Sequence, residues 1–147
     1  KNVSGWLSYT YSIAKAHASN DRDFWTAGST NYVDWDQRHT LCLVLNHTNK
    51  KWRYTLVGRY GSGLPYGENN SKRAPANTVF DLNIAREVHG GLLPEGELRL
   101  GISNLFNVGT ALDYAPEYDP ETLEEIGWKP TARVPSRFIG LSYVRRY

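Results

Sequence analysis

The chain contains no methionine, a single cysteine, and no apolar run of about 18 residues that could cross a bilayer as a helix. Without methionine it has no initiator, and it begins at Lys1 without the basic and apolar segments of a signal peptide. We therefore expect it to be a processed part of a longer polypeptide. Cys42 has no partner for an internal disulfide, and we expect it to be a small packed residue rather than a nucleophile.

An excess of one charge is also absent. A formal net charge of +2 over 147 residues is too small to indicate nucleic-acid binding. The mean hydropathy is negative, −0.54, but this does not exclude a membrane protein, because strands of membrane barrels alternate apolar and polar residues. The four histidines are scattered, and no metal-ligand or nucleophile spacing occurs. We therefore predict no enzyme activity, no metal and no cofactor.

The chain does contain segments in which apolar and polar residues alternate with period two, the pattern of a β-strand. In one of them, Tyr54 and Leu56 fall on one face, and Thr55 falls on the other. The segments with this pattern are residues 4–16, 38–46, 52–61, 78–88, 97–107 and 137–147. We predict an all-β fold, an antiparallel meander of about six strands within one unit covering residues 1–147.

The connections between these segments alternate in length. Residues 47–51 and 89–96 are short and rich in turn-forming residues, whereas residues 15–37, 62–77 and 108–136 are long. Outer-membrane barrels keep short turns on one side of the bilayer and long loops on the other. The alternation therefore predicts strands that cross a membrane, with the three long loops on one side.

The apolar face of such a sheet needs a cover. A soluble antiparallel sheet with one dry and one wet face is the alternative, but it requires a helix layer or a second sheet, and no amphipathic helix of adequate length is visible. Lipid provides that cover. Because the smallest membrane barrels have about eight strands, we predict a fragment of a larger outer-membrane β-barrel.

Two sets of side chains are candidates for function. Aromatic residues of the long loops could stack on sugars or aromatic chelators, although packing of loop on loop is the alternative. These aromatic candidates are Trp25, Tyr32, Trp35, Tyr66, Tyr114, Tyr118 and Trp128. Charged residues on the polar face would be costly against lipid, so we expect them to face the barrel lumen or a plug. These charged candidates are Arg53, Arg59, Asp81, Glu97 and Arg99.

The last long loop is acidic. Asp119 followed by Pro120 predicts the start of a helical turn that ends at Gly127, because aspartate is a favoured N-cap and proline a favoured first helical residue. The acidic side chains between residues 113 and 125 do not have the spacing of a calcium-binding EF-hand loop. We expect a solvated acidic loop rather than a calcium site.

Four motifs, in this order along the chain, resemble the end of TonB-dependent outer-membrane receptors. They are Trp35-Asp36-Gln37-Arg38-His39-Thr40-Leu41, Arg59-Tyr60-Gly61-Ser62-Gly63-Leu64-Pro65-Tyr66, Phe80-Asp81-Leu82 and Asn104-Leu105-Phe106-Asn107. The chain ends with Gly140, Tyr143 and a terminal aromatic, Tyr147, which resembles the signal that the barrel assembly machinery recognises. Arg145 departs from that signal, since an apolar or aromatic residue is usual there, but an arginine that snorkels is tolerable.

The resemblance implies a parent barrel of about 22 strands that is closed by an N-terminal plug and located in the bacterial outer membrane. Such a receptor imports a scarce ligand, for example a siderophore, cobalamin, an oligosaccharide or a peptide, by coupling to the TonB complex through its plug. The long loops would lie outside the cell and the short turns in the periplasm. The expected partners are outer-membrane lipid, the barrel assembly machinery, the TonB complex and a small-molecule ligand.

The plug and the earlier strands are absent from this chain, so we expect the chain alone to transport nothing. Two other interpretations remain open from the sequence. One is a fragment of a small structural or adhesive outer-membrane barrel, and the other is a fragment of an outer-membrane hydrolase.

Overall fold

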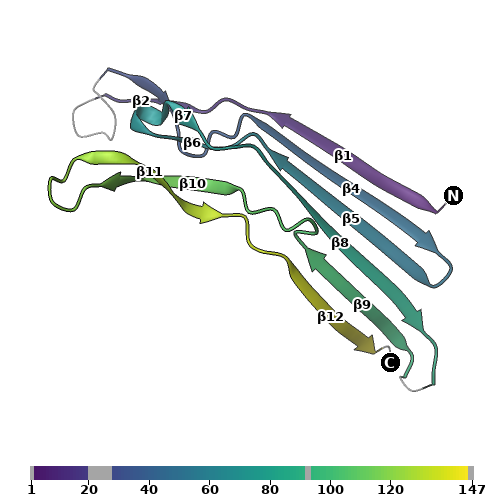
Figure 1. Cartoon of the computed structure of the whole chain (residues 1–147). Helices are drawn as coiled ribbons and strands as arrows, with labels where there is room; N and C mark the ends of the chain where they lie inside the picture. The colour runs from purple at the N-terminus through teal and green to yellow at the C-terminus, as the bar shows by residue number, and fades with distance from the viewer. Residues whose placement is uncertain (1, 20–27, 92–93, 146–147) are drawn as a thin grey trace.

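The computed structural model describes residues 2–19, 28–91 and 94–145, and the chain is all-β with antiparallel sheets, as predicted (Figure 1). Its main sheet has six strands in the order β1-β4-β5-β8-β9-β12, and each strand is antiparallel to its neighbours. The sheet is open, with β1 and β12 at its edges. The strands are β1 (Val3–Tyr11), β4 (His39–Asn49), β5 (Trp52–Gly61), β8 (Asn77–Val88), β9 (Gly96–Ser103) and β12 (Phe138–Arg145).

Three two-stranded sheets lie within the long connections. They are β2 (Lys15–His17) with β3 (Thr30–Tyr32), β6 (Pro65–Tyr66) with β7 (Lys72–Arg73), and β10 (Ala111–Tyr118) with β11 (Glu125–Arg133). A short 3-10 helix, η1 (Glu68–Asn70), separates β6 from β7. Figure 1 shows these elements together at one end of the main sheet, here called the loop end. The opposite end, the turn end, holds both short turns, the start of β1 and the finish of β12.

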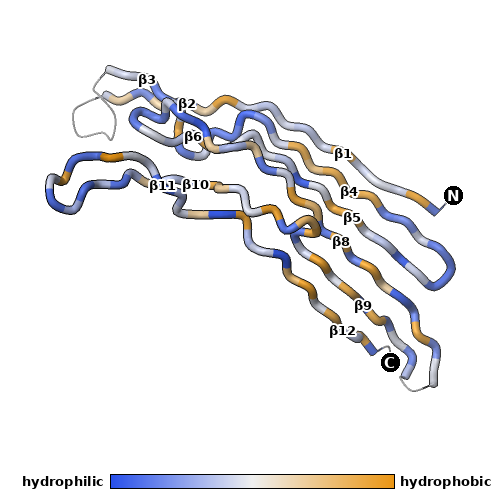
Figure 2. Tube along the Cα trace, in the orientation of Figure 1, coloured by the Kyte–Doolittle hydropathy of each residue, from blue (hydrophilic) through white to orange (hydrophobic). Residues whose placement is uncertain are grey.

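The register gives the main sheet one apolar and one polar face, because side chains one residue apart point to opposite faces. One row of paired residues across five strands is entirely apolar, and it consists of Leu45, Leu56, Leu82, Ile102 and Ile139. The adjacent row, on the other face, contains Asn46, Thr55, Asn83, Gly101 and Gly140. Figure 2 shows the resulting alternation of hydrophobic and hydrophilic positions along the strands.

The apolar face is not covered by any of the described segments. Leu7 is 62% exposed, Ile139 61% and Leu141 70%, although neighbouring side chains partly cover Leu56 and Leu82 at the centre of the sheet. The buried apolar residues all lie at the loop end, and they are Ala18, Val33, Ala74, Ala111 and Val134. None of the helices in the described ranges is long and apolar enough to cross a membrane.

The first strand is shorter than predicted. It was expected to reach residue 16, but β1 ends at Tyr11. The reason lies in the next connection, because the backbone N–H of Ala14 donates to the carboxylate of Asp36 at 2.6 Å instead of joining the strand ladder. The chain then turns away, and β2 pairs with β3.

The fifth predicted strand also ends early, at Ser103 rather than residue 107. Asn104 adopts a left-handed conformation with a φ of 50° and is buried. Its amide nitrogen donates to the carbonyls of Val108 and Pro135, at 2.8 and 2.7 Å, and its side-chain oxygen accepts from the Val108 N–H. One asparagine therefore ends β9 and ties it to the segment that leads into β12.

The helical turn predicted from Asp119 to Gly127 is confirmed only at its start, where the Leu123 N–H donates to the Asp119 carbonyl at 2.9 Å, and it is wrong beyond that point. Asp119 does accept hydrogen bonds from the backbone N–H groups of Glu121 and Thr122, but these bonds close the loop of the β10–β11 hairpin. Glu125 already belongs to β11 and pairs with Tyr118. Pairing with β10 outweighs the local helix signal, because propensity is weak against tertiary contacts.

Candidate functional site

The loop end is organised around Asp36, whose side chain is fully buried. Its carboxylate accepts hydrogen bonds from Ala14 and from Arg73 of β7, and the Arg38 guanidinium lies 3.5 Å away. Burial raises the pKa of Asp36, but the hydrogen bonds and the two arginine charges outweigh burial and hold it below its usual value. A charged Asp36 thus joins the first long connection to the second.

Tyr32, which is half-buried, belongs to the same network around Asp36. Lys15 and Arg38 lie 4.7 Å from the centroid of its ring, and Arg73 lies 5.3 Å from it. Asn70 donates from its side chain to the Tyr32 carbonyl at 2.7 Å. Tyr32 was predicted to bind a ligand, but its ring contacts cations of the chain itself and does not line the groove described next.

A groove of about 1400 Å³ opens at the loop end, between the β2–β3 and β6–η1 segments and the β10–β11 hairpin. Figure 1 shows these segments facing one another across the loop end. Of the seven aromatic residues singled out from the sequence, the groove is lined by Trp35, Tyr66, Tyr114, Tyr118 and Trp128. Trp25 lies outside the described residues.

The groove aromatics divide into two kinds. Tyr66 stacks on Tyr114, with ring centroids 4.3 Å apart and an interplanar angle of 16°, and Trp128 lies tilted beside Tyr66 at 5.8 Å. This is packing of loop on loop, the alternative weighed from the sequence. In contrast, Trp35 is 73% exposed and Tyr118 55% exposed, so their rings are open to a ligand.

Four carboxylates line the same groove, and the sequence alone did not single them out as a group. They are Asp34, Glu68, Asp113 and Glu125. Asp113 and Glu125 lie within the acidic stretch noted in the last long loop, which was the one available signal. Asp34 and Glu68 come from the other two connections, so only the fold unites the four.

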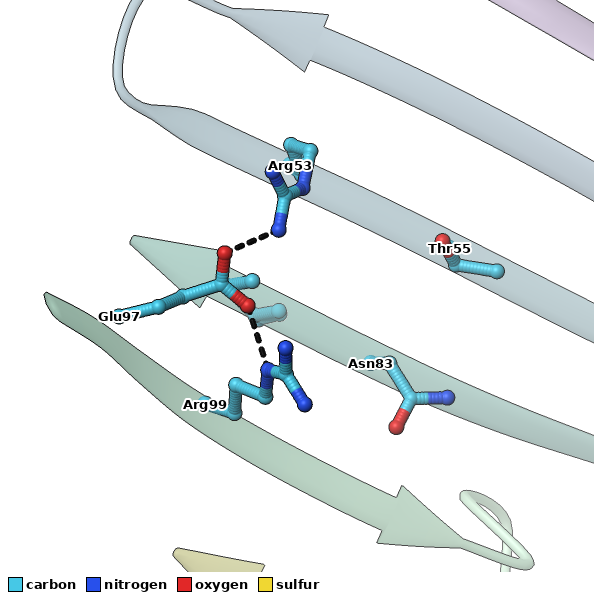
Figure 3. A pocket seen from close by; sticks show the side chains of 7 residues that line it. Arg53, Thr55, Asn83, Glu97 and Arg99 are labelled. Carbon is cyan, nitrogen blue, oxygen red and sulfur yellow. Dashed lines mark hydrogen bonds and ion pairs between the residues drawn. The ribbon is translucent and has the colours of Figure 1, made fainter. Parts of the chain in front are cut away.

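The second candidate site is a polar cluster on the main sheet. The Glu97 carboxylate is bound by the guanidinium groups of Arg53 from β5 and Arg99 from β9 (Figure 3). Glu97 is only 3% exposed, and the pocket beside it, of about 330 Å³, is also lined by Thr55 and Asn83. Arginine and carboxylate groups thus satisfy one another on this face.

The remaining charged candidates form a second ion pair on the same face. Arg59 donates to Asp81 at 2.5 Å, and Asp81 also accepts from the backbone N–H of Asn104 at 2.8 Å. All five residues predicted to face a lumen or plug therefore lie on the polar face of the sheet, in two clusters. Cys42 is half-buried and pairs with Arg59 in the register.

Of the residues of the C-terminal signal, Tyr143 lies near the turn end of the last strand. Gly140 and Tyr143 belong to β12, and the Tyr143 hydroxyl donates to the carbonyl of Pro94 at 2.6 Å. This bond fixes the last strand to the turn between β8 and β9. Tyr147 lies outside the described residues.

The site offers aromatic faces and carboxylates but no metal centre, since no three His, Cys, Asp or Glu side chains in the described ranges are grouped to hold an ion. The lining of the groove offers aromatic faces for stacking and carboxylates for hydrogen bonding. Comparisons with known protein families, with curated proteins and with solved structures each find no match for the chain.

Proposed function

We propose that the chain forms part of the wall and the outer loops of an outer-membrane β-barrel receptor of the TonB-dependent kind, which captures a scarce ligand for import. The observation that carries the proposal is the main sheet, in which one face is apolar and uncovered by the described chain while the other is polar and ion-paired. Membrane β-barrels have this arrangement, with lipid on the apolar face.

The apolar face is difficult to reconcile with water. It presents a continuous apolar row from β4 to β12, and soluble monomers rarely expose apolar patches larger than a few hundred Å². Lipid removes this cost and demands paired backbone groups, which the antiparallel ladders supply. Arg53 and Arg59 would be costly against lipid, so the polar face is the one that looks inward.

The strand lengths and aromatic residues support the same proposal. β4 and β5 have 11 and 10 residues, matching the roughly 9–11 residues of a tilted transmembrane strand. On the apolar face, Trp52 and Tyr54 stack at the turn end with ring centroids 6.1 Å apart. At the loop end, the Tyr9 hydroxyl bonds His39 at 2.8 Å. Aromatic residues at both ends of the apolar band are typical of the two membrane interfaces.

The open edges of the main sheet indicate that the chain is not a complete barrel by itself. Six strands are fewer than the roughly eight of the smallest barrels, and both β1 and β12 have a free edge in this structure. In the proposal, further strands complete the wall, a plug closes the lumen, and the TonB complex supplies the energy for import. The isolated chain then transports nothing.

A pair of matched substitutions on one strand tests the lipid-facing assignment. Leu56→Arg places a charge at the middle of the apolar face, and Thr55→Arg places the same charge on the polar face of β5. We expect Leu56→Arg to weaken partitioning into lipid vesicles by about 2–4 kcal/mol, the cost of an arginine near the bilayer midplane. Thr55→Arg should partition like the unmodified chain.

Partitioning is measured by flotation with vesicles and by quenching of tryptophan fluorescence with brominated lipid. Equal behaviour of the two variants would contradict the assignment of faces. An unmodified chain that stays monomeric in water and does not partition into vesicles would contradict the membrane proposal itself. Either result returns the chain to the class of soluble antiparallel sheets.

A further inference from the structure

The groove at the loop end carries a net negative charge that the rest of the chain does not share. Four carboxylates line it, and no lysine or arginine does among the described residues on its walls. The whole chain carries a formal net charge of +2, so composition does not account for this local excess. The negative charge arises because the fold brings these four carboxylates together in the groove.

Three carboxylates outside the groove have arginine partners. Asp36 pairs with Arg73, Glu97 is held between two arginines, and Asp81 pairs with Arg59. Arginines therefore offset the charge of these three carboxylates, one of which lies in the network around Asp36 and two on the polar face of the main sheet.

The groove carboxylates have neutral partners. Glu125 accepts from the Trp128 indole N–H at 2.7 Å, Asp113 from the Thr131 hydroxyl at 3.1 Å, and Asp34 from the Asn70 amide at 2.7 Å. Such bonds orient the oxygens and leave their charge in place. Within the described chain, no ion pair involves any of these three residues.

We propose that the groove binds an extended ligand that carries guanidinium or ammonium groups. Each cation would meet a carboxylate and an open aromatic face, Trp35 or Tyr118, and both attract positive charge. The inference rests on the proposed function, because it specifies which ligand the outer loops capture. Negatively charged chelates are disfavoured by repulsion from the groove.

Two features of the groove set the form of the ligand. The carboxylates come from three separate connections and form no metal-binding group in the described residues, so they suit several cationic groups rather than one ion. The volume of about 1400 Å³ exceeds the roughly 300–1000 Å³ of a site for one drug-sized molecule. A ligand of several residues or rings fits both features.

Three tripeptides of similar size test the charge preference on the full chain in lipid vesicles. Triarginine supplies the cations, tricitrulline is its neutral isostere, and triglutamate is the anionic control. Binding is followed by calorimetry and by the fluorescence of the groove tryptophans. We expect triarginine to bind about tenfold more tightly than tricitrulline, triglutamate not to bind, and the preference to weaken as salt is raised.

Matched variants locate the effect. Asp113→Asn combined with Glu125→Gln removes two groove charges but keeps the acceptor oxygens for Thr131 and Trp128. It should abolish most of the preference for triarginine. Glu121→Gln combined with Glu124→Gln also removes two charges, at exposed residues of the same hairpin that do not line the groove, and it should leave the preference intact.

Other outcomes would contradict either the ligand class or the membrane proposal. Equal binding of triarginine and tricitrulline, preferred binding of triglutamate, or a preference that survives the double variant rejects the cationic ligand. Vesicle insertion, measured by flotation on the same samples, reports separately on the membrane proposal. A chain that inserts without preferring triarginine therefore keeps the receptor proposal and loses only the ligand class.

Discussion

The main sheet and the loop end differ in how their side chains are buried. In the main sheet, apolar residues repeat in register over five strands, yet Leu7 and Leu141 remain mostly exposed. In the loop end, strands of two or three residues and the longer β10–β11 hairpin enclose small buried side chains and a fully buried Asp36. The loop end therefore supplies its own core from charge pairs and hydrogen bonds, whereas the sheet depends on a cover that the described chain does not provide. The two regions should respond to different perturbations.

The largest expected effect is that of Asp36→Asn. The substitution removes the buried charge that binds Arg73 and faces Arg38. Because both arginines are partly exposed, leaving them without that charge costs up to about 3 kcal/mol. We expect faster amide hydrogen exchange in β2, β3, β6 and β7, with unchanged protection in β4 and β5. Uniform loss of protection across both regions would show that they are not separate units.

Acidification should produce a smaller effect of the same kind. The pKa of Asp36 lies below its usual value in the folded chain, so the unfolded chain binds the proton more readily. This stabilisation is complete above the ordinary aspartate pKa of about 3.9 and is lost as the pH falls through the folded value. We expect the loop end to open in acid before the main sheet does, as measured by hydrogen exchange at a series of pH values.

The Asp36→Asn variant is the control for this titration, because its residue 36 does not ionise. Asp119 also has a lowered pKa, since it accepts hydrogen bonds from the backbone N–H groups of Thr122 and Glu121. Within the loop end, the acid response left in the variant should therefore be confined to the tip of the β10–β11 hairpin. An unchanged response in β2 and β3 would refute the role given to Asp36.

The smallest expected effect is that of Arg59→Gln. The Arg59 side chain is 54% exposed, so its pair with Asp81 is screened and contributes less than about 1 kcal/mol. Glutamine can still donate to Asp81, which also keeps its bond from Asn104. We expect almost no change in the hydrogen exchange of β5 and β8. A large loss there would mean that the polar face, like the loop end, depends on its ion pairs.

The sequence was informative where structure is periodic. In β5, Tyr54 and Leu56 lie on the apolar face and Thr55 on the polar face, because the period of two fixes the faces once a strand is identified. The same regularity placed Arg53 and Arg99 on the polar face. Alternation depends only on residues that are neighbours in the sequence, so the face of each side chain can be predicted before the fold is known.

The loop end could not be read in this way. β2 and β3 have three residues each, too few for a period to appear, and β10 and β11 are interrupted by register shifts. The role of Asp36 depends on Arg73, 37 residues along the chain. The aromatic residues of the groove were picked out by type, but its four carboxylates come from three connections, and only tertiary contacts bring them together.

The aromatic residues at the two ends of the apolar face also indicate the thickness of the bilayer that the sheet would fit. In a bilayer, the ten residues of β5, tilted by roughly 40°, would span about 25 Å between the level of Trp52 and that of the loop end. Arg86 lies over the Trp52 ring at 5.0 Å, so its charge is held at the margin of the apolar band rather than within it. A thicker membrane would draw this arginine into hydrocarbon. Under the membrane proposal, the sheet would be matched to a thin bilayer, and hydrophobic mismatch would oppose its residence in a thicker one.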